Sequence, residues 1–418
     1  MAKKQWVNLP SEDSSTVKKA TFVGDGVDSA DVMGRKVYIE ASFDKKDATT
    51  IATLEVKPDG GNAVYEPEES KLAHDKTATA KISDEGKAKW EVKLSAAGGD
   101  KFKFAVEHQG KKKDLPDEFE THRRLFYQVI DMTGVTGLSS FGFWETEFKK
   151  NKREISLVKI ASKGSIDRSY NFDYKGSEYS RLFNLAKDKY NDVKDPYCFA
   201  VVWADCLAQG PTEKVVEKTG VSKTSGSVAV PLGGGQLWKN IDKASTAAPW
   251  NKMIAFIYTK DGSEQTFPIP DPDVTSTYTE ITVNTRNFPE GVTGKIKAKV
   301  NVATGFHGGW SFPTQNIIVI ATRGWYDRAY SDAKKKSILI HESGHKIGMV
   351  PDGTAGLKEQ STYDKVHDPS KKSHCNDNAC TMWWTTTYEK DVFCSVCDKS
   401  VRKVDLYAPG LQGFTRFF

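Results

Sequence analysis

Long hydrophobic stretches are missing from this sequence of 418 residues. No uninterrupted apolar run approaches the roughly 20 residues with which an α-helix crosses a bilayer, so we expect no membrane span. The first residues, MAKKQWVNLPSEDSS, contain no apolar core of the kind that a Sec-type signal peptide carries. These two absences predict synthesis in the cytoplasm, with a signal-independent secretion or phage-like apparatus as the route of any export.

A strong net charge is also missing. The 60 lysines and arginines are nearly balanced by 55 acidic residues, which leaves a net charge of +5. Lysines occur in scattered groups, such as those at 111–113 and 334–336, without forming a basic helix or alternating with aromatic residues. Because nucleic-acid binding proteins usually concentrate positive charge on one face, the pattern predicts a solvated surface and no nucleic-acid partner.

Cysteine is scarce, with six residues in the chain, but four of them are crowded together. Cys198 and Cys206 lie in the apolar stretch YCFAVVWADCL and are expected to be buried free thiols. The other four fall within 23 residues: Cys375, Cys380, Cys394 and Cys397. In a reducing compartment such crowding indicates a metal site more than disulfide bonds.

Short segments that alternate apolar and polar residues fill residues 1–115. They are separated by turn signals such as PDGG and AAGGD, a pattern that predicts a small antiparallel β-sandwich of immunoglobulin-like type. Because the region lacks clustered titratable or metal-binding residues, we expect it to serve in docking or as a spacer. Residues 110–124, rich in lysine and acidic residues, have the composition of a linker.

Residues 116–300 continue with strand-like segments and one amphipathic helix at 177–192. They are expected to form either a separate domain or the N-terminal part of the domain that follows. Residues 301–418 include the stretch ATGFHGGWSF, expected to be a turn, and then the strand NIIVIAT. The next helix is predicted to begin at Ser331 or Asp332, either of which could cap it, and to end near Gly348.

This predicted helix carries the pattern HExxH in SILIHESGHKIG, formed by His341, Glu342 and His345. Residues four positions apart project from the same face of a helix, so the two imidazoles could share one metal ion. The pattern is that of zinc peptidases, in which zinc makes a bound water acidic and the glutamate takes its proton as the water attacks a carbonyl. The sequence therefore predicts a catalytic zinc site with Glu342 as general base.

A third zinc ligand is not evident from this pattern, although catalytic zinc sites usually have three protein ligands and an open position for water. Five residues could supply it: Asp352, Glu359, Glu389, His367 and His374. Asp352 is the nearest along the chain, and either glutamate would have to be presented by a second helix. The residue types alone leave this choice open.

The segment SHCNDNACTMWW places His374 directly before Cys375, with Met382 eight residues after the histidine, and FCSVC follows. The order HExxHxxG, HCx4CxM and CxxC resembles the archaemetzincins, a family of metzincin-type zinc peptidases. The resemblance is confined to residues 337–397 or thereabouts. One feature departs from the family: His374 lies 26 residues after the motif glycine, where the family's third histidine follows within a few residues. The intervening polar stretch has the composition of an inserted loop.

The resemblance implies two Zn²⁺ ions per chain. It assigns the catalytic zinc to His341, His345 and His374. It makes Glu342 the general base. It places Met382 in the Met-turn, which forms an apolar floor beneath the metal. It assigns a structural zinc to Cys375, Cys380, Cys394 and Cys397, and four thiolates at this spacing can close a tetrahedral site. Because of the inserted loop, Asp352 stays an alternative third ligand.

Three further residues follow the Met-turn position. Trp383 and Trp384 would either line a pocket for the substrate or belong to the core. Tyr388 would either donate a hydrogen bond to a developing oxyanion or pack as an ordinary tyrosine. These roles depend on where the chain turns after Met382, which the sequence does not specify.

We therefore expect an α+β chain in which an N-terminal immunoglobulin-like β-sandwich precedes a β-rich, metzincin-like zinc peptidase domain. Its substrate would be a peptide or a protein. One alternative is an effector (toxin) protease that docks through its N-terminal β-domain to a delivery apparatus or spike protein. Another is a non-catalytic binding or structural protein that zinc stabilises.

Overall fold

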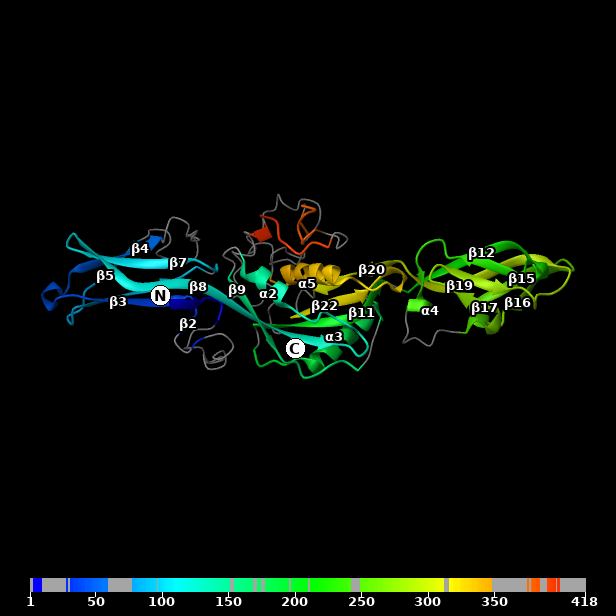
Figure 1. The fold of residues 1–418 in the computed structure, drawn as a ribbon, viewed down its shortest axis with the longest axis horizontal. Helices are drawn as coiled ribbons and strands as arrows, with labels where there is room; N and C mark the ends of the chain where they lie inside the picture. Colours follow the sequence, from blue (N-terminus) through cyan, green and yellow to red (C-terminus); the bar gives the residue numbers. More distant parts are fainter. Residues whose placement is uncertain are drawn as a thin grey trace.

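The chain is rich in β-strands and has few helices, which confirms the α+β prediction. The computed structural model describes residues 3–9, 28, 31–58, 77–95, 97–150, 154–167, 171–173, 177–194, 197–209, 211–241, 249–311, 316–347, 374–375, 377–383, 389–395 and 397–398. Figure 1 shows an elongated arrangement, with N-terminal strands at one end, most of the helices in the middle and further strands at the other end. Among the described residues, none of the helices has the length and apolar character needed to cross a membrane.

The N-terminal strands enclose a core of their own. One sheet contains β4 (Ile51–Pro58), β5 (Thr77–Lys81), β7 (Lys101–His108) and the first part of β8, all antiparallel. The pair β3 (Lys36–Ser42) and β6 (Lys87–Lys93) is also antiparallel. Alternate residues of these strands are buried together, among them Ile39, Leu54, Trp90 and Phe104. The strands predicted within residues 1–115 are therefore present.

One long strand joins this end of the molecule to the middle. The segment 110–124, predicted to be a linker, instead lies in β8 (Lys111–Asp131), so the linker prediction is wrong. The first part of β8 pairs with β7 and, in parallel, with β1 (Lys3–Trp6), which also pairs with β2 (Val32–Met33). From Arg123 onward it pairs with β9. The charged residues that suggested a linker occupy the exposed part of the strand, while Arg123 is fully buried.

The central sheet is mostly parallel. Its order is β9 (Ile155–Ile160), β8, β11 (Cys198–Gln209) and β22 (Ile317–Arg323), with β21 (Gly309–Ser311) antiparallel at the edge. Two short strands, β10 (Asn171–Asp173) and β20 (Gly305–His307), pair with the end of β11. Every residue of β22 is buried, as expected for a parallel strand that is covered on both faces.

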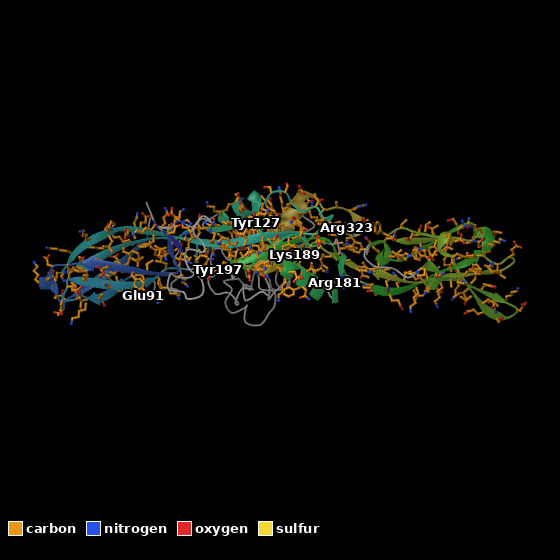
Figure 2. All side chains as sticks on the ribbon, turned by 90° about the horizontal axis from the view of Figure 1, so that it is seen from below. Glu91, Tyr127, Arg181, Lys189, Tyr197 and Arg323 are labelled. Atoms are coloured by element: carbon orange, nitrogen blue, oxygen red, sulfur yellow. The ribbon has the colours of Figure 1, made fainter. Side chains whose placement is uncertain are left out.

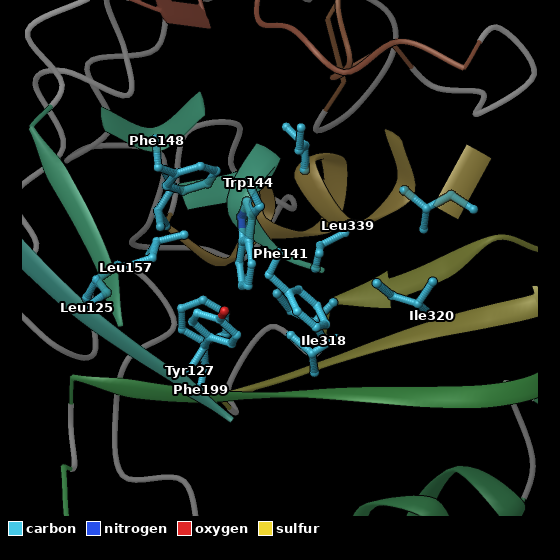
Figure 3. Close-up of a cluster of buried hydrophobic side chains, with 14 of the residues drawn as sticks. Leu125, Tyr127, Phe141, Trp144, Phe148, Leu157, Phe199, Ile318, Ile320 and Leu339 are labelled. Atoms are coloured by element: carbon cyan, nitrogen blue, oxygen red, sulfur yellow. The ribbon is translucent and has the colours of Figure 1, made fainter. Parts of the chain in front are cut away.

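Helices cover both faces of this sheet (Figure 1). On one face, α2 (Gly142–Lys149) and α5 (Asp332–Lys346) pack on Phe199, Val201 and Ile318, as Figure 3 shows in part. The alternate residues Ala200, Val202 and Val319 point to the other face, where α3 (Ser177–Lys189) covers them. The predicted helix at 177–192 is confirmed, whereas α2 was not expected.

A third part of the chain is inserted between β11 and β20. It contains β12 (Thr212–Ser222), β13 (Ser227–Pro231), β14 (Gln236–Leu237), α4 (Trp238–Ile241), β15 (Ile254–Lys260), β16 (Ser263–Pro268), β17 (Val274–Ser276), β18 (Glu280–Asn284) and β19 (Thr293–Ala303). These strands have their own hydrophobic cluster, which includes Phe256 and Ile296. Residues 116–300 thus contribute to separate cores.

An ion pair joins two strands of the central sheet near the insertion (Figure 2). Arg323 Nη2 donates to Asp205 Oδ2 at 2.9 Å, which connects β22 to β11.

The core beneath α2 and α5 is expected to dominate the stability of the central part. Trp144 is fully buried, with its ring 4.8 Å from that of Tyr127 and 5.4 Å from that of Phe199. Replacing Trp144 by Ala would remove these contacts and leave a cavity, so we expect the free energy of unfolding to fall by about 3–5 kcal/mol in urea titrations. Trp325→Ala, at a position 41% exposed, is the control and should cost about 1 kcal/mol or less. Equal losses in the two variants would contradict the expectation.

Candidate metal centre

Helix α5 begins with a side-chain cap and carries the HExxH pattern in its buried part. The hydroxyl of Ser331 accepts a hydrogen bond from the backbone N–H of Lys334 at 3.1 Å, which confirms the predicted N-cap. From Ser337 to Gly344 every residue of the helix is buried, because it lies between the central sheet and the C-terminal segment. The helix therefore presents His341 and His345 from one face within the protein.

Three imidazoles meet at this face. The Nε2 atoms of His341 and His345 are 3.1 Å apart. The ring of His374 lies 5.2 Å from that of His341 and 5.1 Å from that of His345, between centroids. One nitrogen of each ring lies within 4.8 Å of the others. Nitrogen ligands about 2.0–2.1 Å from a tetrahedral zinc lie about 3.3–3.4 Å apart, so the observed separation fits a shared metal ion.

The orientation of His341 leaves its Nε2 available as a ligand. Its Nδ1 lies 2.7 Å from the carbonyl oxygen of Thr381, so Nδ1–H donates to that carbonyl and Nε2 carries the lone pair. Burial and, second, the charge of nearby His374 lower the pKa of His341 to about 4, although the hydrogen bond to Thr381 acts in the opposite direction. The imidazole is therefore neutral at pH 7, which is the form that binds a metal.

Glu342 is also buried, beside the edge strand β21. Burial raises its pKa to about 8, although a hydrogen bond from the backbone N–H of Ser311 and the charge of Lys346 act in the opposite direction. A Cβ atom built on Gly309 would lie only 2.9 Å from Glu342 Oε1, so the strand approaches the carboxylate closely because this residue has no side chain. The prediction that 303–312 is a turn is wrong, since this stretch contains β20 and β21.

The four clustered cysteines form a second group. No disulfide bond joins them, and their sulfur atoms all lie within 4.8 Å of one another: Cys375, Cys380, Cys394 and Cys397. The Sγ atoms of Cys375 and Cys394 are 3.8 Å apart. Sulfur ligands about 2.3 Å from a tetrahedral zinc lie about 3.8 Å apart, whereas a disulfide bond measures about 2.05 Å. The group could therefore hold a metal ion.

Backbone N–H groups point at these sulfur atoms. Asp377 donates to Cys375 Sγ and Cys394 donates to Cys380 Sγ, both at 3.2 Å. Hydrogen bonds within the group, from Cys375 first, lower the pKa of the Cys394 thiol, and the same kind of contact raises the pKa of Cys375 and Cys397. The backbone donors stabilise sulfur in the thiolate form, which is the form that binds metals.

Other predicted residues have mixed outcomes. Met382 is fully buried, and its carbonyl accepts from the N–H of Cys375 at 2.8 Å. Trp383 is partly buried, and its N–H donates to the carbonyl of Cys380 at 3.1 Å. Glu389 is not a third ligand, because it accepts from Ser331 Oγ at 2.5 Å at the first turn of the helix, about 15 Å along the axis from the histidines. Six residues named in the sequence analysis lie outside the described residues: Gly348, Asp352, Glu359, His367, Trp384 and Tyr388.

Three residues of this centre were missed in the sequence. Thr381 orients His341 through its backbone carbonyl, and it stands at the one unspecified position between the second cysteine and the methionine of HCx4CxM. Ser311 and Gly309 contact Glu342 from a stretch that was expected to be a turn. Contacts through the backbone of Thr381 or Ser311 do not depend on the residue type, and the glycine that the close approach requires at 309 is also typical of a turn. No protein-family model matches the sequence, and no curated protein matches it either.

Proposed function

We propose that the protein is a zinc metallopeptidase of archaemetzincin-like type. The observation that carries the proposal is the position of Glu342, a buried carboxyl group one residue from His341 in a group of three convergent imidazoles. Three protein ligands leave a fourth position for water or substrate, as in catalytic zinc sites. A carboxyl group whose pKa is raised toward neutrality suits a general base that must also return the proton.

The donor atoms favour zinc in both groups. Neutral imidazoles suit zinc, copper, iron and nickel, whereas four thiolates at tetrahedral spacing suit zinc or iron–sulfur chemistry. Zinc is the metal that satisfies both sets without redox chemistry. We therefore propose two Zn²⁺ ions per chain, one catalytic among the histidines and one structural among the cysteines.

The proposed mechanism is hydrolysis of a peptide bond. Zinc, when bound, would polarise the carbonyl and lower the pKa of the attacking water. Glu342 takes the proton of that water and passes it to the leaving amine, while the N–H of Ser311 holds the carboxylate in place. Because β21 is the edge strand of the described central sheet, an extended peptide could pair with it beside Glu342.

Two finer assignments belong to the same proposal. The full burial of Met382, next to the segment that holds His374, supports a Met-turn beneath the metal. The separate core of the N-terminal strands supports an immunoglobulin-like sandwich that acts as a spacer or docks to a delivery apparatus. Trp383 and Trp384 as pocket residues and Tyr388 as an oxyanion donor stay predictions.

A direct test is hydrolysis of a quenched fluorescent peptide library by the zinc-loaded protein. We expect cleavage that a chelator abolishes and that added Zn²⁺ restores, because the general base acts only on a water that the metal has made acidic. Full zinc occupancy of the histidine group without cleavage of any peptide or of unfolded protein would instead support a non-catalytic protein stabilised by zinc.

The close approach of β21 to Glu342 gives a further expected result. In Gly309→Ala, the new Cβ would lie 2.6 Å from Ile338 Cγ2 and 2.8 Å from Glu342 Cγ, so the carboxylate must shift. We expect kcat/KM for a cleaved peptide to fall by about 10- to 100-fold with the zinc content unchanged. Gly142→Ala is the matched control, because its nearest neighbour would be Ser140 Oγ at 4.0 Å. Full activity of Gly309→Ala would show that Glu342 tolerates displacement.

A further inference from the structure

The histidine and cysteine groups are built on the same short segment of chain. His374 is bonded directly to Cys375, and Thr381 stands between Cys380 and Met382. Thr381 provides the carbonyl that accepts the Nδ1–H of His341 at 2.7 Å. Two of the three imidazoles therefore depend on residues that are covalent neighbours of cysteines.

Core packing and hydrogen bonds also hold this segment: Met382 and Phe393 are buried in the core that includes α5. The N–H of Cys375 donates to the carbonyl of Met382 at 2.8 Å, and the N–H of Thr381 donates to the carbonyl of Val392 at 2.8 Å. The hydroxyl of Thr381 donates to the carbonyl of Ser337 in α5 at 3.3 Å. None of the strands of the large sheets extends into residues 374–398 as far as they are described. The cysteine group takes its members from both ends of the segment, Cys375 and Cys397, so a metal ion bound there would fix the two ends to each other.

From this arrangement we propose that the cysteine group controls the metal affinity of the histidine group. A metal ion in the cysteine group fixes the positions of His374 and of the Thr381 carbonyl, and thereby completes and orients the ligand set around His341. Thr381 acts as a positioning residue through its backbone. Loading is ordered, with the cysteine group first. The inference rests on metal binding by both groups, as proposed above, and not on peptide cleavage.

Coupling of this kind is reciprocal in free energy. If metal in the cysteine group raises the affinity of the histidine group by some factor, metal in the histidine group must raise the affinity of the cysteine group by the same factor. Losing a contact that orients a ligand typically lowers metal affinity by about 10- to 100-fold, which sets the expected size of the factor.

Co²⁺ titration of the metal-free full-length protein tests the coupling, because thiolate-bound Co²⁺ absorbs strongly in the near ultraviolet and imidazole-bound Co²⁺ only weakly in the visible. In the native protein we expect the thiolate signal first and the imidazole signal second. In Cys397→Ser the imidazole signal should require about 10- to 100-fold more free Co²⁺. The matched control is Cys206→Ser, which replaces a buried free thiol outside the group and should leave both steps unchanged.

A second variant keeps the test decisive if Cys397→Ser does not fold. Cys394→Ser removes another, half-buried thiolate of the same group and leaves all three imidazoles in place. Its imidazole signal should also require about 10- to 100-fold more free Co²⁺ than that of the native protein. An unchanged imidazole step in a folded Cys394→Ser or Cys397→Ser would overturn the proposal. Coupled metal binding without peptide cleavage would overturn only the peptidase assignment.

Discussion

Replacing Glu342 by Gln is expected to lower kcat for peptide hydrolysis by about 10²- to 10⁴-fold, the usual contribution of a general base. The amide has nearly the same size and can stay beside the Ser311 N–H, but it cannot take a proton from the attacking water. Zinc content should stay at that of the native protein, because Glu342 is not one of the metal-binding nitrogen or sulfur groups. Kinetics on a cleaved peptide together with elemental analysis would measure both quantities.

Glu154→Gln is the matched control for this experiment. Burial also raises the pKa of Glu154, but this residue lies at the start of β9 and outside the histidine group. We expect its variant to cleave peptides at the native rate. If Glu342→Gln were as active as Glu154→Gln, Glu342 would not be the general base, and the peptidase proposal would lose the observation that carries it.

The same substitution should stabilise the metal-free protein at alkaline pH. The pKa of Glu342 is raised from 4.5 to about 8, so between these values the unfolded chain has lost a proton that the folded chain retains. Below pH 4.5 the carboxyl group is neutral in both states, and its contribution to the free energy of unfolding is complete. As the pH rises from 4.5 toward 8, ionisation stabilises only the unfolded chain, so this contribution is lost. At about 1.4 kcal/mol per pKa unit, the loss is at most about 5 kcal/mol.

Gln cannot ionise, so Glu342→Gln avoids this loss, although its amide must still be buried. We expect the free energy of unfolding of the variant, relative to the native protein, to rise by about 4 kcal/mol between pH 4.5 and pH 8, because the cost of burying the amide is the same at both. Urea titrations in the presence of a chelator at the two pH values would measure the difference. A constant difference at both would contradict the burial of an ionisable group. A gain in stability with a loss of activity is typical of a residue kept for function.

Local patterns in the sequence predicted much of the fold. The alternation in strands such as β6 and the apolar run of β22 each correspond to a strand of the predicted type. The cap at Ser331 and the buried stretch after it correspond to α5. The predictions of β6 and α5 succeeded because the residue spacing follows the buried face, and that of β22 because burial on both faces requires a continuous apolar run.

The failures arose where tertiary pairing overrides composition. The exposed lysines of 110–124 resembled a linker, but they accompany a strand whose backbone bonds are completed by β7 and β1. The glycines of 303–312 resembled a turn, but Gly309 pairs with Ile320 in a strand, at a place where a side chain would meet Glu342. β1, β22 and Glu342 are distant in sequence from the residues they contact, so these contacts could not be predicted from a local window. β7 directly precedes β8 as a hairpin, and the high charge of 110–124 obscured it.

The third ligand posed the same difficulty, since no rule of spacing selects His374 at 26 residues from Gly348. The structure brings the ring of His374 within 5.2 Å of both helix histidines, while Glu389 lies at the opposite end of α5. His374→Ala is therefore expected to lose the catalytic zinc and to lower peptide hydrolysis by several orders of magnitude. Zinc per chain, measured by elemental mass spectrometry, should fall from two to one.

A control variant and the possible zinc contents show which residues bind each ion. His108→Ala removes a histidine that contacts Thr50 in the N-terminal strands, so its zinc content should equal that of the native protein. Because alanine keeps the backbone of Cys375 in place, the zinc that remains in His374→Ala should still be held by thiolates and resist chelators. Two zinc ions in His374→Ala would require another residue to complete the histidine group, and Asp352 would then be the first to replace. One zinc ion in the native protein after loading with excess Zn²⁺ would mean that only one of the two groups binds metal.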